Sequence, residues 1–254
     1  MPNKHERTRR QTHRSPPPLP PDSVYTSCYC EENIYLLAQA FAAQAEADSG
    51  WSWDAYVVFI SNDGKTVALW NSKADRDVVV WDYHVVLVLR SRERSADDET
   101  HEEAPDIDGA ADNMLNSEGS GAWVYDFDTR LPNPCRWAEY VCSTFPYAFD
   151  ARLAPRVAKG FHPLFRVVPA TAYLDYFASD RSHMLKHLAD GSEPEYYSAP
   201  PSYPALCGPK AREMGVINNL MQSYVTMARG ASGPTSPDSF GVVMDLRELL
   251  HWGT

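Results

Sequence analysis

The sequence lacks the long apolar segments that export or membrane insertion requires. Its 254 residues contain no run of the roughly 18 to 20 apolar residues that a helix needs to cross a bilayer. The N-terminal region likewise lacks the apolar core of a signal peptide. These absences predict a soluble, intracellular protein without a membrane partner, located in the cytoplasm by default.

Cysteine is scarce and irregularly placed. The five cysteines stand at positions 28, 30, 135, 142 and 207. An odd number without an export signal excludes a disulfide framework and predicts reduced thiols. A zinc site built on Cys28 and Cys30 stays open, although no second pair of cysteines or histidines follows at the spacing of a zinc finger.

Basic residues are outnumbered, but the imbalance is local. The formal net charge is −11, and residues 93–120 alone carry ten acidic side chains against the single Arg94. The rest of the chain is nearly neutral and offers no basic face for nucleic acid. Because the segment also lacks periodicity, we expect residues 92–120 to be a disordered acidic insertion between two paired strands. An acidic interaction element is the alternative.

The first 22 residues differ in composition from the rest. Five lysine and arginine residues precede the segment 16–21, in which five of six residues are proline. This pattern predicts a disordered, basic and proline-rich tail. A role of the tail in nuclear import stays open, so the nucleus is a second expected location. We expect residues 23–254 to form one catalytic domain, and the protein to be a monomer because no interface pattern is visible.

The apolar periodicity predicts one helix followed by several strands. Apolar residues recur at helical spacing from Tyr29 to Gln44. The turn residues 62–65 predict a hairpin between the two strands that flank them. The expected strands are Tyr56–Ser61, Thr66–Trp70, 78–90, 122–128, Phe165–Pro169 and Phe240–Leu246, and the further helices are Arg136–Ser143, Thr171–Phe177 and Ala211–Met227. This order is typical of a single α+β domain.

One expected strand carries a histidine in its apolar middle. Residues 78–89 are rich in β-branched side chains and contain His84, and such a run indicates a buried strand. Asp82 is two residues away and would lie on the same face of the strand. By itself His84 is as compatible with a structural core histidine as with a catalytic base.

Two further segments supply a thiol and a carboxylate. Cys30 stands where the helical pattern begins, and the free amides of a first helical turn stabilise a thiolate or an oxyanion. Asp126 lies between Tyr125 and Phe127 in an expected strand, where an unpaired carboxylate would be costly. If the two strands are neighbours, Asp126 can orient His84, which predicts a Cys30–His84–Asp126 catalytic triad. Cys28 is the competing nucleophile, but it precedes the helix.

The same segments resemble a known family. Trp81-Asp82-Tyr83-His84-Val85 is the sequence that gives the WDYHV-motif family, the protein N-terminal glutamine amidohydrolases, its name. Further similar blocks follow in the expected order and cover the chain from about Val24 to its end, apart from the acidic insertion. They are Tyr25–Asn33, Tyr56–Asn62, Tyr125–Thr129, Phe177–Met184 and Phe240–Val243.

This resemblance implies a fold and a reaction. The expected fold is a papain/transglutaminase-like cysteine hydrolase core, with an antiparallel sheet and the nucleophile at the start of an N-terminal helix. The expected reaction converts the side chain of an N-terminal glutamine to glutamate and releases ammonia, without metal or organic cofactor. The same resemblance places the product in the arginylation branch of N-degron proteolysis. The family triad falls on Cys30, His84 and Asp126.

A site for a chain terminus must also bind the free α-ammonium group. A buried ammonium needs a carboxylate or carbonyl partner, and Glu31, Asp82 and Asp180 are the candidate acidic residues. Two other functions stay open. One is a different Cys-His-Asp enzyme, either a peptidase or a transglutaminase-like acyltransferase. The other is a non-catalytic module that binds N-terminal residues.

Overall fold

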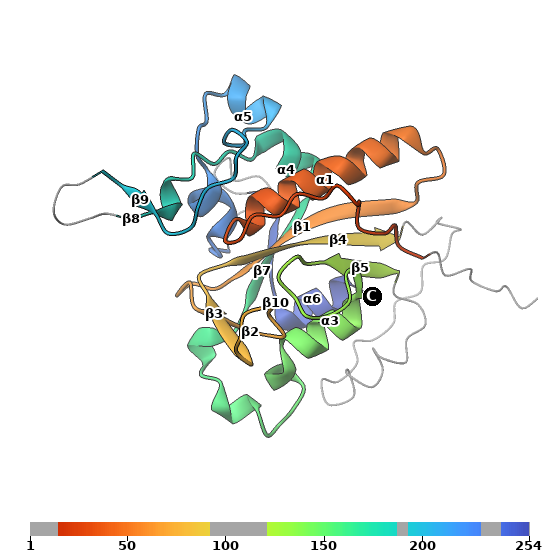
Figure 1. Ribbon diagram of the computed structural model, residues 1–254. Helices are drawn as coiled ribbons and strands as arrows, with labels where there is room; N and C mark the ends of the chain where they lie inside the picture. Colours follow the sequence, from red (N-terminus) through yellow and green to blue (C-terminus); the bar gives the residue numbers. More distant parts are fainter. Residues whose placement is uncertain (1–14, 92–120, 187–192, 230–239, 254) are drawn as a thin grey trace, which may run out of the picture.

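A computed structural model describes residues 15–91, 121–186, 193–229 and 240–253. A six-stranded antiparallel sheet forms its centre, and helices cover both faces (Figure 1). The expectation of a single α+β domain with an antiparallel sheet agrees with this architecture. The strands are β1 (Trp53–Ser61), β2 (Val67–Trp70), β3 (Val78–Trp81), β4 (His84–Ser91), β5 (Ala122–Tyr125), β6 (Cys135–Arg136), β7 (Leu164–Pro169), β8 (Leu185–Lys186), β9 (Glu195–Tyr196) and β10 (Val242–Asp245).

The described helices are mostly short. The α-helices are α1 (Cys30–Ala47), α3 (Trp137–Thr144), α4 (Ala170–Tyr176), α5 (Pro209–Glu213) and α6 (Leu246–Trp252). Single helical turns complete the set: η2 (Pro146–Ala148), η3 (Ala154–Arg156), η4 (Lys159–Phe161), η5 (Ser182–Met184) and η6 (Leu220–Val225). Among the described residues, none of these helices is long and apolar enough to cross a membrane.

The strand order in the main sheet is β10-β7-β1-β4-β5-β6. Strand β4 lies between β1 and β5, with Val57 opposite Leu87 and Leu87 opposite Tyr125. Alternate residues of β4 belong to two separate cores, because Val85 and Leu87 pack under α1 and α4 whereas Val86 and Val88 pack under α3 and α6. Burial on both faces explains the unbroken apolar run in the sequence.

The expected single strand 78–90 is wrong in one respect. The chain breaks at Asp82 and Tyr83, so that β3 pairs with β2 in a small separate sheet while β4 enters the main sheet. Strand β3 is partly exposed, with Val80 at 52%. The break moves His84 to the first position of β4, at the edge of the core.

Two other local predictions are wrong. Residues 62–65 do form a turn, but β1 and β2 do not pair, since β1 lies between β4 and β7. The expected helix Ala211–Met227 is replaced by α5 and η6, because Gly215 adopts a positive φ of 69° and interrupts the helix. The C-terminal segment adds α6, which Asp245 caps.

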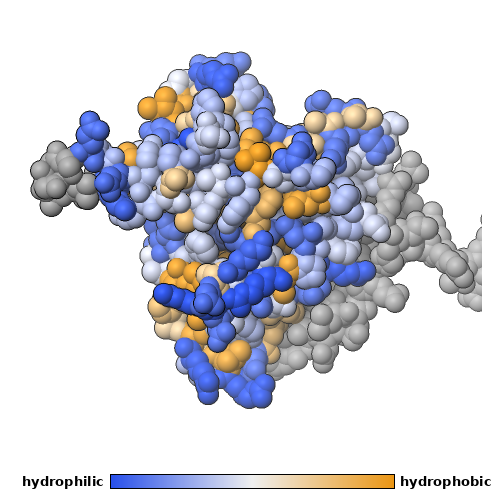
Figure 2. Space-filling model, viewed as in Figure 1, coloured by the Kyte–Doolittle hydropathy of each residue, from blue (hydrophilic) through white to orange (hydrophobic). Residues whose placement is uncertain are grey.

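The proline-rich segment contacts the domain. Tyr125 donates a hydrogen bond of 2.5 Å to the carbonyl of Pro17, and Leu19 packs against the core under α1. A disordered tail that extends to residue 22 is therefore wrong for residues 15–22. The first 14 residues and the expected acidic insertion 92–120 lie outside the described residues. Figure 2 shows the apolar side chains of one face as separate patches among hydrophilic ones.

Candidate active site

The nucleophile candidate stands at the start of α1. Cys28 adopts a left-handed backbone conformation, with φ of 68°, and α1 begins two residues later at Cys30. Both thiols line one cavity of about 270 Å³, Cys28 as an exposed and Cys30 as a buried residue. The remaining lining residues are Trp81, Asp82, Tyr83, Asp128, His183, Met184 and Tyr197.

A local pair of hydrogen bonds fixes the turn that presents Cys30. The side chain of Asn33, in the first turn of α1, accepts a hydrogen bond from the Thr26 amide at 2.8 Å and donates one to the Thr26 carbonyl at 2.9 Å. Because one amide side chain satisfies both polar groups of Thr26, the segment before the helix has a defined path. The position of Cys30 is thus determined within eight residues of sequence.

His84 and Asp126 lie together in the interior. His84 Nε2 is 2.9 Å from Asp126 Oδ1, and both side chains are almost fully buried. Tyr140 donates to Asp126 Oδ2 at 2.7 Å, and the amide of Asp128 donates to Oδ1 at 2.8 Å. The sequence had suggested that Asp126 lies within a strand, but the residue directly follows β5. Its carboxylate nonetheless reaches the histidine of the neighbouring strand.

The electrostatics of this pair favour the charged forms. Burial by itself raises the pKa of Asp126, but His84 and Tyr140 outweigh it and lower the pKa overall. Burial likewise lowers the pKa of His84, and the Asp126 carboxylate reverses this effect and raises it. An ionised carboxylate only accepts hydrogen bonds, so His84 Nε2 carries a proton toward Asp126. His84 Nδ1 is therefore the nitrogen that remains for other chemistry.

Cys30 and His84 line two adjoining cavities rather than one. The Val85 backbone, next to His84, lies within hydrogen-bonding reach of the Cys30 thiol. Trp81 and Asp128 line both the cavity at Cys30 and a smaller one at His84, so the two cavities adjoin. His84 Nδ1 is buried and has no hydrogen-bond partner.

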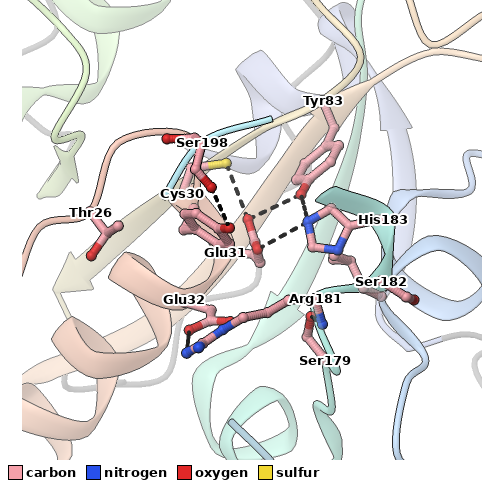
Figure 3. Close-up of polar contacts among 12 residues, drawn as sticks. Thr26, Cys30, Glu31, Glu32, Tyr83, Ser179, Arg181, Ser182, His183 and Ser198 are labelled. Atoms are coloured by element: carbon pink, nitrogen blue, oxygen red, sulfur yellow. Dashed lines mark hydrogen bonds and ion pairs between the residues drawn. The ribbon is translucent and has the colours of Figure 1, made fainter. Parts of the chain in front are cut away.

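The Cys30 thiol instead faces Glu31. Cys30 Sγ lies 3.7 Å from Glu31 Oε2, which also accepts a hydrogen bond of 3.0 Å from Tyr83 (Figure 3). His183 Nε2 is 3.3 Å from the Tyr83 hydroxyl and 3.5 Å from Glu31 Oε1. Glu31 is completely buried, and its Oε1 accepts no hydrogen bond.

These surroundings keep the thiol protonated. Burial raises the pKa of Cys30 well above its usual range, and the negative charges of Glu31, Asp128 and Asp82 raise it further. The sequence predicts that the amides of the first helical turn stabilise a thiolate at Cys30. In the structure, burial and the neighbouring carboxylates outweigh that stabilisation and raise the pKa of the thiol.

The three acidic residues expected to bind the α-ammonium occupy different places. Asp82 is exposed and lines the cavity, which places it away from the buried His84 rather than on the same face. Glu31 lies behind the cavity wall that Cys30, Tyr83 and His183 form. Asp180 is exposed, accepts hydrogen bonds from Ser182 and Asn218, and does not line the cavity.

A buried ion pair stabilises the loop opposite the nucleophile. Glu32 is completely buried and binds Arg181 through two contacts of 2.8 Å (Figure 3). Arg181 also donates to the carbonyls of Pro201 and Tyr203. Because Arg181 adopts a positive φ of 64°, the segment around it is constrained. The pair thus joins the start of α1 to residues 201–203.

Several residues at the site were missed in the sequence. Asp128 lines both cavities and His183 lines the cavity at Cys30, and neither was among the residues expected at the site. Tyr140 comes from α3, and no sequence spacing relates it to Asp126. The one available signal for Asp128 was its place in the similar block Tyr125–Thr129.

Three side chains that could bind a metal ion lie close together near the site. One potential ligand atom each of His84, Asp126 and Asp128 lies within 4.8 Å of the others. Hydrogen bonds already engage them, His84 with Asp126 and Asp128 with Tyr25 at 2.6 Å. This group contains no thiol, so it does not support zinc binding by Cys28 and Cys30.

Comparisons with known proteins identify the family. The profile of the N-terminal glutamine amidases matches residues 25–252. A protein N-terminal glutamine amidohydrolase of Drosophila pseudoobscura pseudoobscura is 34% identical over 233 residues, which cover 91% of this chain and 88% of the relative. Those of Drosophila mojavensis and Drosophila grimshawi are each 36% identical, with 91% and 85% of this chain and 88% and 83% of the relatives covered. The resemblance of the motif blocks is thereby confirmed, and the chain belongs to the N-terminal glutamine amidase family.

Proposed function

We propose that this protein is an amidohydrolase that converts the side chain of an N-terminal glutamine to glutamate and releases ammonia. Its curated relatives carry the name of this activity. The observation that carries the proposal is a helix-start thiol, Cys30, in a cavity that adjoins the one lined by His84, a histidine that the buried Asp126 carboxylate orients. Such an arrangement is suited to acyl transfer from an amide.

The first chemical step is attack on the carboxamide. Cys30 gives its proton to His84 Nδ1, and the thiolate sulfur bonds to the side-chain carbonyl carbon of glutamine. The amides of the first turn of α1 are the candidate donors for the resulting oxyanion. His84 then returns the proton to the nitrogen, so the C–N bond breaks, ammonia leaves, and a γ-glutamyl thioester remains.

The second step is hydrolysis of the thioester. His84 accepts a proton from water, the hydroxide oxygen bonds to the thioester carbon, and the C–S bond breaks. The product is an N-terminal glutamate, and Cys30 recovers its thiol. Asp126 holds the His84 ring in one orientation and stabilises its protonated form in both steps. The scheme thus uses three side chains, the backbone amides of the first turn of α1, and water.

The cavity is suited to a substrate with a free α-ammonium group. Asp82 and Asp128 line it, and its described lining residues include no lysine or arginine. A negative lining attracts a cation and disfavours a carboxylate. We therefore assign the α-ammonium to Asp82 and Asp128, with Glu31 behind them. Asp180 is the weakest of the three sequence candidates, because it lies outside the cavity lining.

The proposal also includes the type of fold, the oligomeric state, the location and the pathway of the protein. A nucleophile at the start of a helix, with a histidine on one strand and an aspartate directly after the neighbouring strand, is the arrangement expected of a papain/transglutaminase-like core. We propose that the protein acts as a monomer in the cytoplasm, with the nucleus as a second location. There its product would enter the arginylation branch of N-degron proteolysis.

Matched peptides test the reaction. One peptide begins with glutamine, one begins with asparagine, and one carries glutamine only at an internal position. We expect ammonia release and an amide-to-acid mass change for the first peptide only. Cys30→Ala should abolish the activity and Cys28→Ala should retain it, which separates the two thiols.

Other results of the same experiment would support one of the alternative functions. Cleavage of a peptide bond would indicate a peptidase, and transfer of internal glutamine to an added amine would indicate an acyltransferase. Binding of the N-terminal glutamine peptide without conversion, by folded and reduced protein, would indicate a recognition module. Each of these results would contradict the proposed reaction.

A further inference from the structure

Three polar atoms beside the candidate nucleophile are not satisfied. Glu31 Oε1, His84 Nδ1 and His183 Nδ1 are buried and have no hydrogen-bond partner. Glu31 is 0% exposed, and the His183 side chain is 9% exposed. Buried polar atoms are ordinarily paired. His183 lines the cavity at Cys30, Glu31 lies behind its wall, and His84 lines the adjoining cavity, so the three unpaired atoms indicate that a polar ligand completes the site.

The charges around Cys30 indicate the sign of that ligand. The titratable groups that interact with Cys30 or share its cavity are Glu31, Asp82, Asp128, His183, Tyr83, Tyr173, Tyr197 and Cys28, and His84 lines the adjoining cavity. Three of these are carboxylates. Of the two histidines, His84 is engaged with Asp126 and His183 is 3.5 Å from Glu31. The site is therefore short of positive charge, and a cation would complement it.

The direction of the Cys30 thiol shows which group is affected by the shortage of positive charge at the site. Cys30 Sγ is 3.7 Å from Glu31 Oε2, whereas His84 Nδ1 has no partner. A thiol that faces a carboxylate cannot transfer its proton to the histidine. Attack on an amide requires the opposite arrangement, with the thiolate beside a protonated imidazole.

We propose that the α-ammonium of the substrate switches on the nucleophile: it enters the acidic cavity, compensates the charge of Glu31, and so frees the Cys30 thiol to turn to His84. This inference rests on the proposed function and adds a mechanism for its specificity. Glu31 acts here as a positioning residue, since it works through Cys30. An internal glutamine brings no ammonium group, so it would meet a protonated and misdirected thiol.

The switch transfers a single proton. The ammonium remains protonated and forms no covalent bond. The Cys30 proton moves to His84 Nδ1, which creates a thiolate–imidazolium pair inside the cavity. A nearby positive charge stabilises the thiolate, whereas the carboxylates alone oppose it. Substrate binding and nucleophile activation are therefore one event.

Titration of Cys30 with a small ligand tests the switch. Alaninamide carries the α-ammonium but its methyl side chain is too short to react, and N-acetylalaninamide is the uncharged control. The thiolate is followed by its ultraviolet absorbance as the difference between wild type and Cys30→Ala. We expect alaninamide to move thiolate formation down by about one pH unit or more, and N-acetylalaninamide to have no effect.

Two matched variants test whether Glu31 is the residue through which the ammonium group acts. In Glu31→Gln the thiolate should form at lower pH without ligand, and alaninamide should add little. Glu46→Gln removes the same charge from an exposed position of the same helix, and it should titrate as wild type does. If Glu31→Gln does not fold, Asp82→Asn at the exposed edge should weaken alaninamide binding and preserve the shift at saturation.

The results that would overturn the switch differ from the results that would overturn the proposed function. Competitive inhibition by alaninamide without a shift of the titration would overturn the switch. So would an unchanged titration in Glu31→Gln, or a complete lack of alaninamide binding. Absence of ammonia release from every glutamine peptide would instead overturn the proposed reaction, whatever the titration shows.

Discussion

Tyr140 donates a hydrogen bond of 2.7 Å to Asp126 Oδ2, on the side of the carboxylate opposite to His84. The two residues come from α3 and from the segment after β5, and both are buried. A buried carboxylate needs its lone pairs satisfied. Tyr140 thus stabilises the charge that orients the histidine, and it adds a fourth residue to the predicted triad.

Tyr140→Phe tests this contribution. The loss of a hydrogen bond to a buried charge should lower kcat for an N-terminal glutamine peptide about tenfold or more, while KM changes little. Tyr147→Phe is the matched control, because it removes a buried hydroxyl that has no hydrogen-bond partner. Equal kcat values for both variants would show that the hydroxyl of Tyr140 does not support Asp126.

The His84–Asp126 pair should make stability depend on pH. The pKa of His84 is raised on folding, so its contribution is complete below about pH 6.5 and is lost as the pH rises through the raised value. The pKa of Asp126 is lowered, so its contribution is present above about pH 4 and is lost as the pH falls. The pair therefore contributes most between these two values.

Asp126→Asn measures that contribution by urea unfolding. At about pH 5.5 the variant should lose roughly 3 kcal/mol of unfolding free energy, because one partner of a buried pair is removed. At about pH 9 the loss should be smaller, because the stability that the raised pKa of His84 contributes declines as the pH rises. A loss that is the same at both pH values would contradict an ion pair at this position.

The Glu32–Arg181 pair should be important for stability. Glu32→Gln leaves a buried guanidinium without its counter-charge and should cost about 3–5 kcal/mol in the unfolding free energy. The double variant Glu32→Gln/Arg181→Met should cost less than the two single changes together. Asp150→Asn at the exposed Asp150–Arg152 pair is the control, with little expected change. Additive effects in the double variant would refute the coupling.

The two exposed acidic candidates can be separated by kinetics. Asp82→Asn should raise KM for an N-terminal glutamine peptide about three- to tenfold, since it removes a carboxylate from the cavity lining. Asp180→Asn should leave KM unchanged, because Asp180 lies outside that lining. Steady-state kinetics with both folded variants decide the point, and a larger effect of Asp180→Asn would reverse the assignment.

Local sequence determined the framework of the site. The helix start at Cys30 follows from apolar spacing and from a motif whose Asn33 closes the preceding turn. The pairing of His84 with Asp126 was also predictable, since a mid-chain carboxylate between aromatic residues needs a buried partner. Where β3 ends and β4 begins was not predictable, because the run 78–89 is apolar and aromatic apart from Asp82 and His84 and contains no glycine or proline.

The family, the α+β class and the three residues that we propose for catalysis could be predicted from the residue order, because they depend on short segments with fixed spacing. The direction of the thiol and its charge state could not be predicted in this way, because they depend on contacts that form on folding. Glu31, Tyr83, Asp128, Tyr140 and His183 lie far apart in the chain and meet only after folding. Electrostatic interactions depend on distance and burial in space, which residue order does not specify.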